Sequence, residues 1–209
     1  MQNGIPYLDI LIFGVIAIFL IFRLKNILGT KTDFEENGLN EKKQTKQHSN
    51  VFSLKSNKNI SINTEIDKIT KVDSNFDMVN FLNGSKTFFE IVLKGFVSGN
   101  LDRVKDYIKP SVLKSFKVAI DDRNKEDETL IIDLISIEKN KIVSSIITKT
   151  SIKINVIFET LQITALMDKN DKIIDGDTDK EILVKDEWVF EKKINDQNNN
   201  WTLIETKSF

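Results

Sequence analysis

Residues 78–96 read MVNFLNGSKTFFEIVLKGF, and their apolar side chains recur every three or four positions. This spacing puts them on one face of an α-helix, while Asn83, Lys86, Glu90 and Lys94 take the opposite face. The apolar face is wide and aromatic, and carries Met78, Phe81, Leu82, Ser85, Phe88, Phe89, Val92, Leu93 and Phe96. The stretch therefore predicts a long helix that needs a large apolar surface to pack against.

Two shorter helices are expected directly after it. Gly99 suits the left-handed position that ends a helix, Asn100 can cap a second helix, and Pro110 suits the first turn of a third. The second helix would carry Leu101, Val104 and Ile108. The third helix would bury Val112, Leu113, Phe116, Ala119 and Ile120.

The apolar period then changes to two, which is typical of strands with one buried face. The first strand would contain Ile132, Leu134 and the run to Ile147; the second alternates Ile152, Ile154, Val156 and Phe158 with Lys153, Asn155 and Ile157. Leu161, Ile163 and Ala165 continue it, and we expect residues 168–180 to be a polar connection. Ile182, Val184, Trp188 and Phe190, and after an Asn-rich turn Trp201, Leu203 and Ile204, complete the sheet. Helices followed by a meander predict an α+β domain, with the long helix packed on a curved antiparallel sheet of about four strands.

The N-terminus has the pattern of a membrane anchor. The run from Ile5 to Phe22 has no Lys or Arg before it, and Arg23, Lys25 and Lys31 follow it. A bilayer core of ~30 Å takes about 20 apolar residues, which Leu8 to Leu28 supply if two of the basic side chains extend to the headgroups. The anchor residues would include Leu8, Phe13, Phe19, Phe22, Arg23 and Lys25. The alternative is an apolar helix buried in a soluble core.

The positions of these charges predict the topology. No basic segment precedes the run and no A-x-A site follows it, so we expect an uncleaved anchor. Positive charge on the C-terminal side alone predicts an N-terminus outside and a cytoplasmic domain, with a periplasmic domain as the alternative. The expected organisation is an anchor at 1–29, a polar flexible tether at 30–75 and a folded domain at 76–209. Five lysines between Glu41 and Lys58 would let the tether lie on anionic lipid, or simply keep it solvated.

Composition argues against several function classes. Acidic and basic residues nearly cancel, 31 against 30, so no positive field is expected to recruit nucleic acid. The chain has no Cys, which removes thiolate nucleophiles and Cys-based zinc sites, and its one histidine, His48, has no partner motif. Asp168, Asp171, Asp175, Asp177 and Asp179 lack the spacing of an EF-hand loop and are expected to be solvated. We therefore expect no catalytic residue, no metal and no cofactor.

Both ends of the chain resemble one family. Residues 13–29 read FGVIAIFLIFRLKNILG and are followed by Phe34 and Glu35, a pattern similar to the N-terminus of bacterial relatives of the mitochondrial inner-membrane translocase subunit 44. The C-terminal similarity comprises Phe89 to Val92, Phe96, Gly99 to Asp102, 116–123, 152–158, Gly176, Asp186, Trp188, Phe190, Glu191, Asn200, Trp201 and Leu203. The resemblance covers the anchor and nearly all of residues 76–209.

The resemblance implies a cystatin-like or nuclear-transport-factor-2-like fold in which helix and sheet enclose an apolar pocket. It also implies a membrane-anchored adaptor: the mitochondrial member holds the import motor chaperone, and its C-terminal domain associates with the inner membrane. The long chaperone-binding region of that member has no counterpart here. We expect the partners to be membrane lipid and an unidentified translocase, chaperone or membrane protein, in protein transport or membrane-protein assembly.

Two functions follow from such a pocket. The first is a non-catalytic, chaperone-like adaptor that binds a protein segment or lipid through aromatic and aliphatic side chains. The candidate pocket residues are Phe88, Val92, Phe96, Phe116, Phe158, Trp188, Phe190 and Trp201. The alternative is an enzyme or small-ligand binder, which would need an Asp, His or Tyr inside the pocket. Tyr107 and Asp186 are the nearest options.

Overall fold

The computed structural model describes residues 66–194 and 200–209. The predicted anchor, and the predicted tether as far as residue 65, lie outside these ranges. Within them, no helix is both long enough and apolar enough to cross a membrane. The elements in chain order are a helical segment at 66–72, α3 (Met78–Ser98), η1 (Lys105–Tyr107), α4 (Pro110–Lys125), β1 (Thr129–Ile147), β2 (Ser151–Met167), β3 (Ile173–Lys193) and β4 (Thr202–Ser208).

α3 is the long helix that the apolar period predicts. Asp77 caps its start, because its Oδ1 accepts a 2.8 Å hydrogen bond from the Asn80 backbone N–H. Gly99 ends it in the left-handed conformation, with φ 75°. The buried face consists of Phe81, Ser85, Phe89, Val92, Leu93, Gly95 and Phe96. The predicted inner face is therefore confirmed.

The segment between α3 and the sheet follows the prediction with one change. The expected second helix is only a three-residue 3-10 turn, η1, although Leu101, Val104 and Ile108 are buried as expected. α4 begins at Pro110 and buries Val112, Phe116, Ala119, Ile120 and Arg123.

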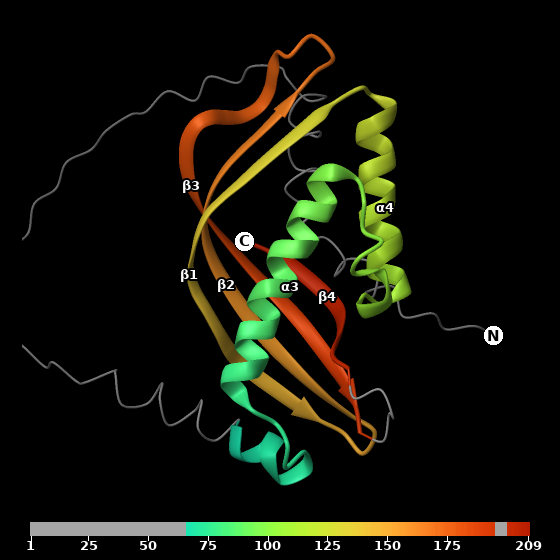
Figure 1. Ribbon diagram of the computed structural model, residues 1–209, viewed down its shortest axis with the longest axis vertical. Helices are drawn as coiled ribbons and strands as arrows, with labels where there is room; N and C mark the ends of the chain where they lie inside the picture. Colours follow the sequence, from blue (N-terminus) through green and yellow to red (C-terminus); the bar gives the residue numbers. More distant parts are fainter. Residues whose placement is uncertain (1–65, 195–199) are drawn as a thin grey trace, which may run out of the picture.

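Four antiparallel strands in the order β1-β2-β3-β4 form one sheet, so the predicted α+β class and strand number are confirmed. Figure 1 shows α3 lying across the sheet, with α4 beside it. The contact is aromatic: Phe89 stacks on Phe158 at a centroid distance of 4.5 Å and lies 4.8 Å from Trp188. Cross-strand pairing of Val156 with Trp188 places the largest core side chain under the middle of the helix.

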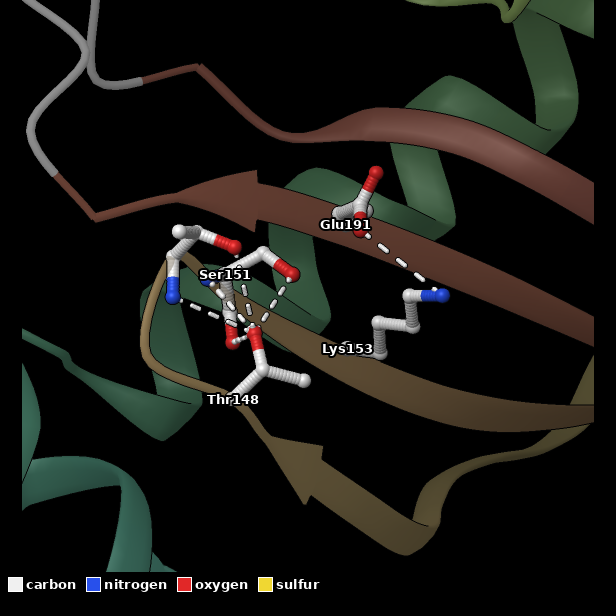
Figure 2. Close-up of polar contacts among 5 residues, drawn as sticks. Thr148, Ser151, Lys153 and Glu191 are labelled. Atoms are coloured by element: carbon white, nitrogen blue, oxygen red, sulfur yellow. Dashed lines mark hydrogen bonds and ion pairs between the residues drawn. The ribbon is translucent and has the colours of Figure 1, made fainter.

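The turn between β1 and β2 is fixed by one hydroxyl. Thr148 Oγ1 accepts hydrogen bonds from the backbone N–H groups of Ser151 (3.0 Å) and Thr150 (3.3 Å), as Figure 2 shows. Close by, Lys153 Nζ lies 3.8 Å from Glu191 Oε1 across β2 and β3. A turn held in this way sets the register of the hairpin, and thereby decides which side chains face α3.

The expected polar connection at 168–180 is wrong in extent. Only residues 168–172 form the turn, and β3 begins at Ile173, opposite Met167. Gly176 pairs with Ala165 at φ 75°, and a Cβ there would lie 2.1 Å from the Thr164 carbonyl oxygen. Since Glu181 is the next residue of β3 that pairs with β2, residues 177–180 bulge out opposite Thr164. The polar sequence therefore belongs to an exposed, irregular part of a strand.

The described end of the predicted tether packs against the domain. Residues 66–72 are helical, and Ile69 is fully buried in the core. Asp73 forms an ion pair with Lys192 of β3, and both side chains are largely buried. Folded structure thus begins before residue 76.

Candidate binding site

A pocket of about 250 Å³, here called the sheet-end pocket, lies between the C-terminal half of α3 and one end of the sheet. Its lining residues are Leu93 and Phe96 of α3, Leu130 and Ile132 of β1, Gln162, Thr164, Ala165 and Leu166 of β2, Asp175, Ile182, Leu183, Val184 and Asp186 of β3, Ser208 of β4, and Phe209. Most of these side chains are apolar. The pocket is therefore suited to an apolar group.

The lengths of the elements explain why this end of the sheet is left open. A helix rises about 1.5 Å per residue, so the 21 residues of α3 span roughly 31 Å. A strand rises about 3.3 Å per residue, so the 17 residues of β2 span roughly 56 Å. The helix cannot cover the whole strand, and it ends at Ser98 while the sheet continues.

Asp186 brings a carboxyl group into this apolar pocket. Asp186 is only 4% exposed. It lies two residues before Trp188 on β3, so its side chain is on the same face of the strand as Trp188 and Phe190, which face the core. Ser208 Oγ donates a hydrogen bond to Asp186 Oδ1. Burial raises the pKa of Asp186 to about 6, and the Ser208 hydrogen bond opposes this shift. The pocket therefore contains an acid that changes charge near neutral pH.

Two further polar side chains on β2 face inward: Gln162 lines the pocket, and Thr160 is the next inward-facing residue along the strand. Gln162 Nε2 donates a 2.6 Å hydrogen bond to Thr160 Oγ1, and both residues are buried. Neither residue is among the pocket residues that we expected from the sequence. The available signal was their alternation with Phe158, because every second residue of β2 from 152 to 162 points to the core.

A second pocket of about 220 Å³, the aromatic pocket, lies against the N-terminal half of α3. It is lined by Asn80, Phe81, Gly84, Ser85, Phe88, Tyr107, Phe190 and Trp201. The rings of Phe81 and Trp201 are 4.8 Å apart between centroids, which makes the floor of this pocket a packed aromatic cluster.

The candidate residues from the sequence do not share one cavity. Phe96 lines the sheet-end pocket, whereas Phe88, Phe190 and Trp201 line the aromatic pocket. Val92, Phe116, Phe158 and Trp188 are buried in the core and line neither. Asp186 and Tyr107 likewise lie in different pockets: Asp186 lines the sheet-end pocket, and Tyr107, which is 43% exposed, lines the aromatic pocket. A ligand role for these residues stays a prediction, as does the role of the anchor residues outside the described ranges.

Arg123 of α4 is buried against the ring of Phe96, which lines the sheet-end pocket. Its Nη2 donates hydrogen bonds to the carbonyl oxygens of Phe96 (3.1 Å) and Val97 (3.0 Å) at the end of α3. Burial lowers the pKa of its guanidinium, and the negative charge of Glu128 opposes this effect. Nowhere in the described ranges do three acidic or histidine side chains gather closely enough to hold a metal ion.

The described residues form an α+β domain: helices are followed by a four-stranded antiparallel meander, and an apolar pocket lies beneath the end of the longest helix. The sequence pattern of the Tim44-like domain matches residues 63–208, so the chain belongs to the Tim44-like domain family. This confirms the resemblance seen in the sequence.

The comparison with curated proteins found no match. Among solved structures, the domain is similar to the intermembrane space region of chloroplast protein ARC6, with a TM-score of 0.44 and 11% sequence identity. That similarity covers 65% of this chain and 98% of the other.

Proposed function

We propose that the chain is a membrane-tethered, non-catalytic adaptor that holds a segment of another polypeptide in the sheet-end pocket. The family assignment supports an adaptor module, and the apolar pocket between the C-terminal half of α3 and the sheet is the observation that carries the proposal. The same family and the long helix across the sheet favour a cystatin-like or nuclear-transport-factor-2-like fold type. The bound segment would come from a translocase, a chaperone or a membrane protein.

The size of the pocket favours a side chain over a cofactor. Pockets for drug-sized ligands are typically about 300–1,000 Å³, and the sheet-end pocket is smaller, at about 250 Å³. Complete burial of one Leu or Phe side chain contributes about 1.5–3 kcal/mol. A contact of this strength is weak and reversible, which suits a module that captures and releases passing segments near a membrane.

The proposed location is the bacterial inner membrane, with the N-terminus outside and the domain in the cytoplasm. The support is the charge asymmetry around the apolar run, with Arg23 and Lys25 on its C-terminal side only. A periplasmic domain is the alternative. Paired cytoplasmic and periplasmic reporters fused after Phe209 distinguish the two, because only the reporter on the correct side is active.

One observation favours a second function, an enzyme or small-ligand binder. Asp186 is a buried carboxyl whose pKa lies near 6, as a general base requires, and Ser208 donates a hydrogen bond to it. The pocket lining holds no Lys, Arg or His that would stabilise a developing negative charge. We therefore favour binding over catalysis.

Site-specific photo-crosslinking in intact cells tests the adaptor. A photoreactive phenylalanine analogue replaces Leu183, a 66% exposed residue of the sheet-end pocket, or Val118, a 49% exposed residue of α4 outside both pockets. We expect discrete polypeptide adducts at position 183 and none at position 118. Equal labelling at the two positions, or lipid adducts alone at position 183, would contradict a polypeptide-binding pocket.

A further inference from the structure

The charge of the sheet-end pocket is one-sided. Two of its lining side chains are carboxylic acids, Asp175 and Asp186, and none is basic. Two lysines near the pocket, Lys185 and Lys207, lie over the ring of Phe209 at 5.0 and 4.5 Å from its centroid and are not part of the lining. An anionic group that reached the buried Asp186 carboxylate would therefore meet negative charge in an apolar surrounding, where repulsion is strong.

The acidic character continues along the strand that forms the pocket wall. Asp177, Asp179 and Glu181 follow Asp175 on β3, with Lys180 as the one base among them, and residues 176–183 are all exposed. These side chains are solvated and would act at longer range, by attracting positive charge towards the pocket. Asp186 differs from them because it lies inside the pocket, next to the surface that an apolar ligand would occupy.

From this arrangement we infer the chemistry of the bound segment: it is a polypeptide stretch in which a Lys or Arg adjoins apolar residues. The apolar side chain fills the sheet-end pocket, and the basic side chain reaches the Asp186 carboxylate. The inference rests on the proposed function and adds a charge requirement to it. It also disfavours an acidic lipid headgroup as the occupant of this pocket.

The test uses the full chain in phosphatidylcholine nanodiscs and three acetylated, amidated pentapeptides, Ser-Leu-Ile-Lys-Ser and its Lys-to-Gln and Lys-to-Glu forms. Calorimetric titration, with empty nanodiscs as the blank, gives the three dissociation constants. Hydrogen bonds to a charged group are stronger than neutral ones, so we expect the Lys peptide to bind about tenfold more tightly than the Gln peptide and the Glu peptide to bind most weakly.

Asp186→Asn removes the charge and keeps the shape of the side chain. We expect it to reduce the affinity for the Lys peptide to that for the Gln peptide, so that the preference between these two peptides disappears. The matched control is Asp179→Asn, which removes one charge from the same strand at an exposed position outside the lining and should preserve most of the Lys preference. A Lys preference that survives Asp186→Asn would overturn the inference.

A comparison on the unmodified chain keeps the test valid if Asp186→Asn does not fold. With a pKa of about 6, Asp186 is charged at pH 7.5 and mostly protonated at pH 5. A tenfold Lys preference at pH 7.5 should therefore fall to about twofold at pH 5, while the affinity for the Gln peptide stays constant. A preference that does not change between these pH values would count against Asp186 as the recognition group.

The possible failures are distinguishable. Equal binding of the Lys and Gln peptides to the unmodified chain would overturn the charge requirement and leave the proposed adaptor intact. Absence of binding by all three peptides would count against the adaptor itself. Competition by nanodiscs that contain phosphatidylethanolamine, a lipid with an ammonium group, would show that the ligand is a lipid and would overturn the choice of a polypeptide.

Discussion

The guanidinium carbon of Arg123 lies 5.6 Å from the centroid of the Phe96 ring, and Arg123 Nη2 donates a 3.1 Å hydrogen bond to the carbonyl oxygen of the same residue. The last carbonyl groups of a helix have no partner within the helix and form the negative end of its dipole. A buried cation from α4 therefore satisfies the end of α3 at the place where the helix stops and the sheet-end pocket begins.

Arg123→Met should cost the domain about 2–3 kcal/mol, because it removes two charge-assisted hydrogen bonds and leaves only the 3.4 Å bond from the Gly99 N–H on the Phe96 carbonyl oxygen. Both tryptophans of the chain, Trp188 and Trp201, lie in the domain, so urea unfolding followed by tryptophan fluorescence reports on it. Arg103→Met, at an exposed position in the turn after α3, is the control and should change stability little. A similar loss in the two variants would show that Arg123 acts only as a surface charge.

Two glycines of α3 should respond in opposite ways to substitution by alanine. A Cβ at Gly84 meets nothing within 4 Å, so Gly84→Ala should stabilise the domain by about 1 kcal/mol through helix propensity. A Cβ at Gly95 would lie 2.7 Å from the Asn100 carbonyl oxygen, so Gly95→Ala should destabilise. The midpoints of urea unfolding measure both changes, and equal effects would contradict the packing of the α3 end against residues 100 and 101.

The stability of the domain should fall as the pH rises through the pKa of Asp186. Burial raises this pKa from 3.8 to about 6, so the folded state binds a proton more tightly than the unfolded state. The resulting stability is fully present below about pH 3.8 and is lost as the pH rises through about 6, a difference of about 3 kcal/mol. Asp186→Asn should abolish this contribution, so the difference between variant and unmodified chain should move in favour of the variant from pH 5 to pH 8. A difference independent of pH would contradict a buried, titrating Asp186.

Trp188 should tolerate phenylalanine much better than alanine. The side chain is fully buried among Phe88, Phe89, Phe158 and Phe190, so Trp188→Ala should cost about 3–5 kcal/mol through the cavity it leaves. Its Nε1–H is buried and lacks a hydrogen-bond partner among the described residues, and Trp188→Phe removes this unsatisfied donor. Circular dichroism during urea unfolding gives both values. A folded Trp188→Ala variant that loses only peptide binding would show that Trp188 lines a binding site.

Much of this fold could be predicted because each level of the sequence points to the same answer. The apolar period of residues 78–96 and the glycine after Ser98 agree on α3. The alternation from Ile152 to Phe158 fixes the inner face of β2 in the same way. Residues 173–180 were missed as a strand because most of their side chains are polar and residues 176–180 are exposed, and pairing with β2 is a property of the sheet that periodicity does not report.

The pockets were harder to predict than the fold. The aromatic residues of the domain share one periodic pattern, yet the structure separates them into a core, a sheet-end pocket and an aromatic pocket. Two features produce this separation: α3 is shorter than the strands, and Arg123 of α4 packs against the C-terminal end of α3. Both features involve contacts between residues that are distant in sequence. Asp186 could be recognised, because it interrupts an apolar alternation that includes Val184, Trp188 and Phe190.

The most direct test of a polypeptide-binding sheet-end pocket is to fill it. Ile132 lines this pocket and Gly84 lines the aromatic pocket, so Ile132→Trp and Gly84→Leu each place a larger apolar side chain in one of the two. Each substitution is made in the full chain with the photoreactive residue at position 183, and polypeptide adducts are measured in cells. We predict that Ile132→Trp abolishes the adducts and that Gly84→Leu leaves them unchanged, with both variants folded. Persistence of the adducts in a folded Ile132→Trp variant would contradict a segment held in the sheet-end pocket.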